Sequence, residues 1–241
     1  MQEKISTIIA TYNGEAFLKT QIDSILSQLP GDSEIIISDD GSTDRTIEII
    51  HQYDDARFKL FINNDTRGAI NNFENALKHV TGDIIFLSDQ DDIWKPDKVK
   101  VCLEYLRQYD IVVSDCDIID EKDNIVLQSY FARRKSRNGL VKNLWANTYL
   151  GCCIAFNKKV LNISMPFPKD IPMHDIWLGF VGELFFKTCF INKPLVSYRM
   201  HRQNLSPTTV GISPHSIFSK FTFRWNTFKY FPLLFYRKWI K

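Results

Sequence analysis

Acidic and polar side chains gather in three short segments whose residue types suit a cation-dependent phosphate site. The segments are residues 11–15 (Thr-Tyr-Asn-Gly-Glu), 39–44 (Asp-Asp-Gly-Ser-Thr-Asp) and 89–92 (Asp-Gln-Asp-Asp). The carboxylates repel one another, and the sequence holds no glycine-rich phosphate loop of the G-x-x-x-x-G-K type. A Mg²⁺ or Mn²⁺ ion, held by one or two carboxylates and completed by phosphate oxygens, resolves both problems. Asp89 and Asp91, separated by one residue, are the expected ligands.

Turn formation and helix capping compete with this interpretation for single residues. Asp, Asn and Gly favour turns, which is enough to explain Asn13, Gly41 and Asp44. Asp92 is expected to be the N-cap of a helix that begins in the run 93–96. Turns do not require so many carboxylates, so turn chemistry leaves the set as a whole unexplained.

The three segments each follow a run with the pattern of a buried strand. Apolar runs predict strands at 5–10, 34–38, 58–62, 84–87 and 111–113, and periodic apolar positions predict helices near 18–29, 43–53, 70–80 and 99–106. Repeated βα units predict an α/β fold, with a mostly parallel central sheet and helices on both faces. Ligands of such sheets bind at the carboxyl ends of the strands, which places the three segments on one edge. Residues 118–127 are expected to form a hairpin.

Composition narrows the class of protein. The chain has 241 residues, 44% of them apolar, which suits one α/β domain with a tail. A net charge of +2 implies no nucleic-acid partner. The five cysteines lack the C-x-x-C spacing of a zinc or redox site, so reduced thiols in a cytoplasmic protein are expected. Neither a signal peptide nor a membrane-spanning run is recognised.

The last residues differ in composition from the rest. Residues 213–241 contain six Lys and Arg and no Asp or Glu, among many aromatic residues. This mixture is typical of an interfacial helix on anionic lipid, which predicts peripheral contact with the inner face of the cytoplasmic membrane. A C-terminal helix packed on the domain, or a dimer contact, remains the alternative.

Taken together, the three polar segments resemble the sequence motifs of a known family. Residues 6–14, 37–44 and 82–94 occur in the order and at the separations found in the inverting family-2 glycosyltransferases, which have the GT-A fold. The chain resembles that family over about residues 4–210. The Ser-Asp-Gln-Asp-Asp-Ile-Trp segment at 88–94 is similar to the branch of rhamnosyltransferases of bacterial surface polysaccharides.

The resemblance implies a donor site. Thr11, Tyr12 and Asn13 would line the nucleotide base, with Glu15 in the same nucleotide-sugar site. Asp39 would accept a hydrogen bond from the ring N–H of uracil or thymine, with Asp40 beside it. Further along the chain, Asp89 would approach the ribose or the metal shell, and Asp91 would bind the metal.

The resemblance also implies an acceptor site. The family's Glu-Asp pair corresponds to His174 and Asp175, and either could be the catalytic base that takes the acceptor proton. His201 would bind the metal, and Arg199 or Arg202 would pair with phosphate oxygens. Gly151, Cys152 and Cys153 correspond to an acceptor-side segment, and the two cysteines are interpreted as small packing residues rather than nucleophiles.

The resemblance implies an enzyme that moves a sugar, with rhamnose as a candidate, from a UDP- or dTDP-linked donor to an acceptor. That acceptor would be a saccharide or a polyprenyl-diphosphate-linked glycan in O-antigen or capsule synthesis. Residues 1–113 would bind the donor, 114–212 the acceptor, and 213–241 the membrane. The alternatives are a non-catalytic sugar-nucleotide-binding or membrane-adaptor protein and a sugar-1-phosphate nucleotidyltransferase, although the latter's Gly-rich basic loop after the first strand is missing.

Overall fold

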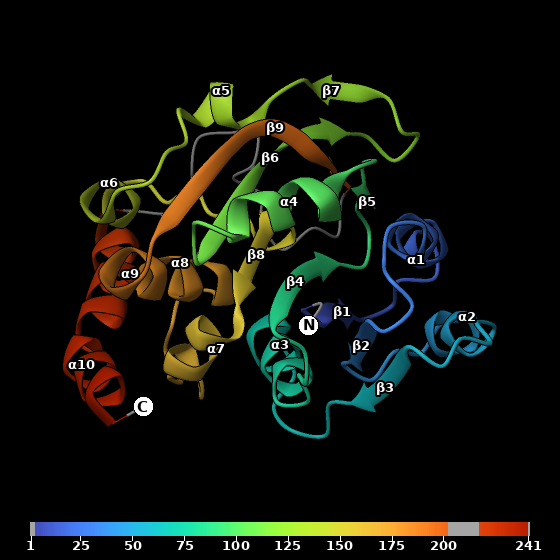
Figure 1. The fold of residues 1–241 in the computed structure, drawn as a ribbon, viewed down its shortest axis with the longest axis horizontal. Helices are drawn as coiled ribbons and strands as arrows, with labels where there is room; N and C mark the ends of the chain where they lie inside the picture. Colours follow the sequence, from blue (N-terminus) through green and yellow to red (C-terminus); the bar gives the residue numbers. More distant parts are fainter. Residues whose placement is uncertain (1–2, 202–216, 241) are drawn as a thin grey trace.

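A mixed sheet of nine strands brings the polar segments together. The computed structural model describes residues 3–201 and 217–240. The strand order is β3-β2-β1-β4-β8-β6-β9-β5, with β7 paired to β6 (Figure 1). The strands are β1 (Ile5–Thr11), β2 (Glu34–Asp39), β3 (Phe58–Ile62), β4 (Ile84–Asp89), β5 (Ile93–Trp94), β6 (Ile111–Ile119), β7 (Ile125–Leu127), β8 (Ile154–Asn157) and β9 (Thr188–Arg199).

Helices connect and cover these strands. They are α1 (Leu18–Leu26), α2 (Thr46–His51), α3 (Ala69–Leu77), α4 (Lys98–Leu106), α5 (Tyr130–Arg134), α6 (Leu140–Trp145), α7 (Lys158–Ser164), α8 (His174–Phe185), α9 (Ile217–Phe228) and α10 (Phe231–Ile240), with a 3₁₀ turn η1 at Gly151–Cys153. The four helices predicted in the first half are present. The helices α1, α2 and α3 are shorter than their apolar patterns, because the chain forms turns at the ends of those patterns, while α4 fills its pattern.

The first four strands form the parallel part of the sheet. β1 lies between β2 and β4, and β3 lies outside β2, all parallel. All six residues of β2 are buried, which requires cover on both faces of the sheet. The register pairs Thr11 with Asp39 and Ala10 with Asp89, so these strands end side by side. The predicted α/β fold and the meeting of the polar segments at one edge are confirmed.

The second half adds strands of both directions. β8 is inserted between β4 and β6 and runs antiparallel to both, while β6 and β9 are parallel. β5 runs antiparallel to β9. The hairpin expected at 118–127 is the β6–β7 pair. β5 has two residues and β8 has four, too few to show a period, so the sequence did not reveal them.

The C-terminal segment is helical where it is described. α9 and α10 pack beside α6, α7 and α8 at the edge of the molecule away from β1–β3 (Figure 1). Aromatic pairs join Phe180 to Phe231 and Phe185 to Phe235. Among the described residues, none of the helices has the length and apolar character needed to cross a membrane. The boundary placed at residue 212 stays a prediction.

Candidate active site

Asp39 sits where β1 and β2 end together, and its carboxylate holds the local backbone. One oxygen accepts bonds from Gly41 N at 3.0 Å and Ser42 N at 2.7 Å, and the other from Thr11 Oγ1 at 2.8 Å and Ser42 Oγ at 2.5 Å. Asp39 is 1% exposed. A base N–H bound here would share an oxygen that already has protein donors. The predicted contact with uracil or thymine stays a prediction.

Tyr12 and Gln90 join the first and third polar segments. Tyr12 N donates to Gln90 Oε1 at 2.8 Å, and Gln90 Nε2 donates back to Tyr12 O at 3.0 Å. A Cβ on Gly14 would lie 2.3 Å from Gln90 Oε1, so the clamp needs glycine at that position. The clamp leaves the Tyr12 side chain 48% exposed, which makes the ring available for stacking on a base. Sequence reasoning missed Gln90.

The first and second polar segments are also joined by side-chain bonds to backbone. Asn13 has a left-handed φ of 48° and accepts from Thr43 N at 2.8 Å. Glu15 accepts from Arg45 N at 3.0 Å. These bonds give Asn13 and Glu15 a role in shaping the loops, while their contact with a nucleotide-sugar stays a prediction.

Asp40 connects the second strand end to the segment before α3. It accepts from Asn63 Nδ2 and from Gly68 N, both at 2.7 Å. Arg67, which sequence reasoning missed, lies against the loop that follows Asp40. A Cβ on Gly41 would lie 2.7 Å from the Nη2 atom of Arg67. Arg67 is exposed and brings a cation to an edge rich in carboxylates. Arg67 lies in the loop between β3 and α3 and belongs to none of the three polar segments, so no pattern in the sequence indicated it.

Asp91 and His201 meet although they are far apart in the sequence. His201 Nε2 lies 2.7 Å from Asp91 Oδ2, and the side chains are only 9% and 13% exposed. The imidazole also contacts the Phe17 ring, with centroids 5.3 Å apart. Both residues were predicted to be metal ligands, although 110 positions separate them in the sequence. A carboxylate and an imidazole at this separation suit a Mn²⁺ site.

Arg199 holds the loop that carries Asp91. Its Nε donates to Asp91 O at 2.8 Å, its Nη1 forms an ion pair with Asp123 Oδ1 at 2.6 Å, and its guanidinium stacks on Phe17 at 4.5 Å. Arg199 is 2% exposed. These contacts give it a positioning role, and its contact with phosphate stays a prediction. Arg202 lies outside the described residues.

Asp92 is not a helix cap, contrary to the expectation from sequence. The strand β5 follows it, and α4 begins only at Lys98. One oxygen of Asp92 accepts from Arg199 N at 2.9 Å, which fixes β9 beside the metal loop. Its other oxygen, Oδ2, is buried and has no hydrogen-bond partner among the described residues. Short extended pairing between β5 and β9 thus replaced the expected helix start.

Asp89, Asp92 and Cys152 form a second group able to bind a cation. Their ligand atoms all lie within 4.8 Å of one another. Burial raises the pKa of Asp89 to about 8, with Asp91 and then Asp175 adding repulsion. Burial, followed by repulsion from Asp91 and Asp89, raises the pKa of Asp92 well above its ordinary value. This crowding, with the unpaired oxygen of Asp92, fits a bound divalent cation.

The ammonium group of a buried lysine lies close to Asp89. Lys98 is completely buried, donates from Nζ to Cys152 O at 2.6 Å, and lies 4.3 Å from the Trp94 ring centre. It acts against the rise in the pKa of Asp89. Sequence reasoning missed Lys98 because it occupies the first position of α4, where lysines are ordinarily solvated.

The two candidate bases at the start of α8 have opposite environments. Burial lowers the pKa of His174 to about 3. Its ring stacks on Phe73 with centroids 3.9 Å apart, and neither ring nitrogen has a partner among the described residues. Burial raises the pKa of Asp175 to about 7, while bonds from Ile176 N and Gly151 N act the other way. Near neutral pH, Asp175 has the titration range of a general base and His174 does not.

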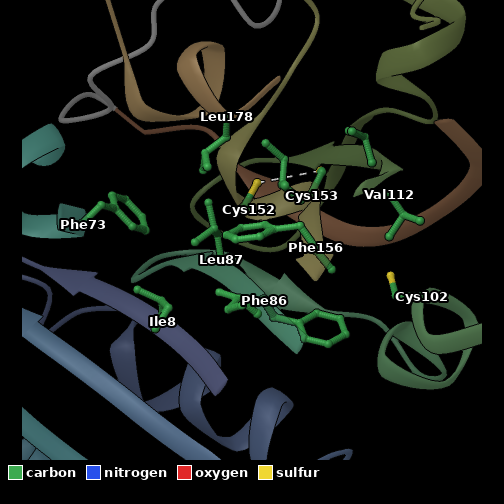
Figure 2. Close-up of a cluster of buried hydrophobic side chains, with 14 of the residues drawn as sticks. Ile8, Phe73, Phe86, Leu87, Cys102, Val112, Cys152, Cys153, Phe156 and Leu178 are labelled. Carbon is green, nitrogen blue, oxygen red and sulfur yellow. Dashed lines mark hydrogen bonds between the residues drawn. The ribbon is translucent and has the colours of Figure 1, made fainter. Parts of the chain in front are cut away.

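The cysteines pack as small core residues, as expected. All five are free thiols. Figure 2 shows Cys152 and Cys153 among Leu87, Phe156 and Leu178, with the two sulfurs 3.9 Å apart. Both are at most 1% exposed. Cys152 therefore fills the core while its sulfur also lies close to the carboxylates of Asp89 and Asp92.

The sheet, with carboxylates at the ends of its parallel strands, has the architecture of the GT-A fold, which the solved structures below share. The model of the family described as "Glycosyl transferase family 2" matches residues 6–163. This is well over half of the chain, so the protein belongs to glycosyl transferase family 2. The family expected from the sequence is confirmed.

Curated bacterial glycosyltransferases are similar to the chain along most of its length. The dTDP-rhamnosyl transferase RfbG of Shigella flexneri is 30% identical over 218 residues, covering 81% of this chain and 72% of that protein. The UDP-Glc:alpha-D-GlcNAc-diphosphoundecaprenol beta-1,3-glucosyltransferase WfaP of Escherichia coli is 29% identical over 204 residues, covering 85% and 80%.

Solved structures share the fold. S. aureus TarS 1–349 in complex with UDP-GlcNAc has a TM-score of 0.69 at 19% identity, covering 83% of this chain and 60% of that one. The mannosyltransferase PcManGT from Pyrobaculum calidifontis, in complex with GDP-Man and Mn²⁺, has a TM-score of 0.60 at 20% identity, covering 80% and 55%. The chain thus spans less than two thirds of the length of these two structures.

Proposed function

We propose that the protein transfers a sugar from a nucleoside-diphosphate donor to an acceptor hydroxyl in a single displacement that inverts the anomeric carbon. The observation that carries this proposal is Asp175. It lies at the start of α8, close enough to Asp89 for their charges to interact, and its pKa is about 7. A base beside a donor-diphosphate site is the arrangement that such a displacement needs.

The donor would occupy the edge formed by the three polar segments. The exposed Tyr12 ring would stack on the base, and Asp39 and Asp40 would lie beneath it. UDP- and dTDP-linked sugars are the proposed donors, because relatives with both kinds of donor match along most of the chain. Rhamnose is the proposed sugar of a dTDP-linked donor.

Mn²⁺ or Mg²⁺ is the proposed cofactor. Asp91, His201 and Asp89 would hold the ion. The group of Asp89, Asp92 and Cys152 is the competing site. The bound ion would stabilise the charge of the departing nucleoside diphosphate as a Lewis acid. The unpaired Asp92 oxygen and the crowding of carboxylates support a cation in this place.

Asp175 is the proposed base, and His174 is the residue that supports it. The neutral imidazole packs between Phe73 and Gly151, where a Cβ on the glycine would lie 2.8 Å from Nε2. This packing fixes the first turn of α8 and therefore the direction of the Asp175 side chain. Asp175 would remove the proton from the acceptor hydroxyl as the hydroxyl attacks.

The proposed acceptor is a saccharide or a polyprenyl-diphosphate-linked glycan of a cell-surface polysaccharide. WfaP, which acts on a diphosphoundecaprenol-linked acceptor by its name, supports this class. We also infer that the protein works in the cytoplasm at the inner face of the cytoplasmic membrane, where residues 213–241 would make the contact.

A donor panel tests the proposal. UDP-, dTDP- and GDP-sugars are added with and without Mn²⁺, and the melting temperature and the release of nucleoside diphosphate with an acceptor present are measured. One donor should stabilise the protein only with the metal, and Asp175→Asn should keep this stabilisation while losing turnover. Donor binding without any release of nucleoside diphosphate, across the acceptors, would instead identify a non-catalytic binding protein.

A further inference from the structure

The small net charge of the chain conceals two halves of opposite sign. Residues 1–123 contain 25 Asp and Glu and 12 Lys and Arg, whereas residues 124–241 contain three Asp and Glu and 18 Lys and Arg. The first half carries the donor edge and its carboxylates. The second half is cationic and suits an anionic partner far larger than a single phosphate.

The three acids of the second half do not neutralise its surface. Glu183 accepts from Tyr149 Oη at 2.8 Å and from Gly139 N at 2.7 Å. Asp170 is paired with Lys229 at 2.6 Å, and Asp175 belongs to the active site. Lys159 and Arg199 pair with Asp110 and Asp123 of the first half, and the other cations in the described part of the second half, apart from Lys229, form no ion pair with a carboxylate.

Cations crowd in the segment that leads into α6. Arg133, Lys135 and Arg137 are exposed. Burial, and then the nearby Arg137 and Arg134, lower the pKa of Lys142. Like charges held this close are relieved by anions, and phosphate groups are suitable ones.

Large apolar side chains stand out from the surface beside these cations. On α6, Val141 is 79% exposed and Trp145 is 77% exposed. On α9, Trp225 is 60% exposed, and on α10, Trp239 is 90% exposed. Phe228, Phe235, Tyr236 and Ile240 are also exposed on α9 and α10. Single exposed apolar residues need no explanation, but eight on three neighbouring helices indicate an interaction surface.

α10 has the reverse of the usual amphipathic arrangement. Its inner side buries Leu234 together with Arg237, whose guanidinium donates to the carbonyls of Ile163, Ser164 and Pro166 at the end of α7. Its outer side presents Tyr236 and Trp239, about one turn apart. A helix of a soluble protein ordinarily faces its arginine outward and its aromatics inward. The outer side of α10 is therefore suited to an apolar environment.

α6 and α9 are joined, so their exposed side chains belong to one surface. Arg224 of α9 donates to Leu144 O at 3.0 Å and Trp145 O at 2.9 Å, and its guanidinium lies 4.7 Å from the Trp145 ring centre. Figure 1 shows α6, α9 and α10 in a row along the edge opposite β1–β3. Residues 133–145 and the outer sides of α9 and α10 are called the docking face below.

We propose that the docking face binds an anionic phospholipid surface, with Trp145, Trp225 and Trp239 at the headgroup level and the basic side chains on lipid phosphates. Tryptophan prefers that boundary, and each nearby Lys or Arg adds attraction to anionic lipid. A second copy of the chain is a poorer occupant, because two cationic surfaces would face each other.

The docking face is coupled to the active site through α8. This helix has Asp175 at its start, and its Phe180 and Phe185 pack on Phe231 and Phe235 of α10. Ten residues of helix separate Asp175 from Phe185, a rise of about 15 Å. If Asp175 is the base of the proposed function, lipid binding sets its height above the bilayer and hence the reach of a lipid-linked acceptor.

Vesicle binding tests the surface without requiring transferase activity. Co-sedimentation is measured with vesicles of phosphatidylcholine alone and with added phosphatidylglycerol, at low and high salt. The wild-type chain should bind the anionic vesicles and lose binding at high salt. The α6 double variant Val141→Ser/Trp145→Ser should bind about tenfold more weakly, since it removes the apolar contact outside the tail. Trp239→Ser should weaken binding in the same direction.

The matched control is Ile125→Ser/Val126→Ser on β7, where the two side chains are 53% and 50% exposed and lie outside the docking face. It should bind as the wild type does, and all variants should keep the wild-type melting temperature. Equal binding by the α6 variant and the wild type would overturn the proposal. So would equal binding to neutral and anionic vesicles, or a wild-type dimer that ignores vesicles and dissociates in the α6 variant.

Transfer to a water-soluble acceptor separates this inference from the proposed function. The α6 variant should keep wild-type turnover with such an acceptor and lose it with an acceptor embedded in anionic vesicles. Vesicle binding without transfer by the wild type would remove the proposed function and leave the docking face standing. Transfer to the soluble acceptor without vesicle binding would remove the docking face alone.

Discussion

Replacing Asp175 with asparagine should stabilise the fold while it abolishes activity. Burial raises the pKa of this carboxyl from 3.8 to about 7. Within that window the folded protein holds the proton more tightly than the unfolded chain does, so stability falls as pH rises, and the whole penalty is present above pH 7. At about 1.4 kcal/mol per pKa unit, a shift of this size corresponds to roughly 4 kcal/mol.

The variant Asp175→Asn keeps the shape of the side chain and removes its charge. Without metal or donor, its melting temperature at about pH 8 should exceed that of the wild type by roughly 10 °C, given about 2–4 °C per kcal/mol for a chain of this size. The difference should be small near pH 4, where only about half of the unfolded chains carry the proton, and should vanish below about pH 3, where the wild-type carboxyl is protonated in both states. Turnover at about pH 8 should fall at least ~100-fold, as expected for loss of a general base. Calorimetry and initial rates across this pH range measure both effects.

Asp170→Asn is the control, because this carboxylate pairs with Lys229 at the surface. It should change neither the melting temperature nor turnover appreciably. A gain in the melting temperature of Asp175→Asn that is the same at about pH 4 and pH 8 would show that ionisation is not its cause. A wild-type kcat/KM that stays flat between about pH 5.5 and pH 8 would refute Asp175 as the titrating base, since about tenfold per unit is expected below pH 7.

Three further changes test other parts of the site. His174→Leu should leave the pH profile of kcat/KM unchanged, because burial holds the pKa of His174 near 3; a lost or shifted profile in rate measurements would contradict this. His201→Ala should weaken Mn²⁺ binding about tenfold or more, measured by calorimetry, by removing the partner of Asp91; unchanged affinity would favour the group around Cys152. Gly14→Ala places a Cβ 2.3 Å from Gln90 Oε1, so it should raise the donor KM severalfold, with equal donor affinity as the outcome against the clamp.

The sequence predicted the elements that follow a repeated pattern of apolar residues. It did not predict contacts between side chains that are far apart in the chain. Strand runs and the polar segments that end them predicted the parallel half of the sheet and the edge where Asp39, Asp89 and Asp91 gather. Lys98 and Arg67 were not predicted, because neither a buried lysine nor a single arginine in a loop forms a recognisable sequence pattern. Asp92 was misread since a capping residue and a strand-end carboxylate look alike until the two-residue strand β5 is seen.

The acid-rich loop and the start of α8 both contain buried carboxyl groups that are difficult to ionise, and this property connects the fold with the proposed function. Asp89, Asp92 and Asp175 each have a raised pKa caused first by burial, and they lie near one another. In the absence of a cation, this crowding lowers stability in neutral solution, and Lys98 offsets it only in part. A divalent ion bound with the donor would lower the pKa of Asp89 and Asp175 together. Donor binding would then ionise the base that the transfer requires, so the pH profile of kcat should lie below that of kcat/KM.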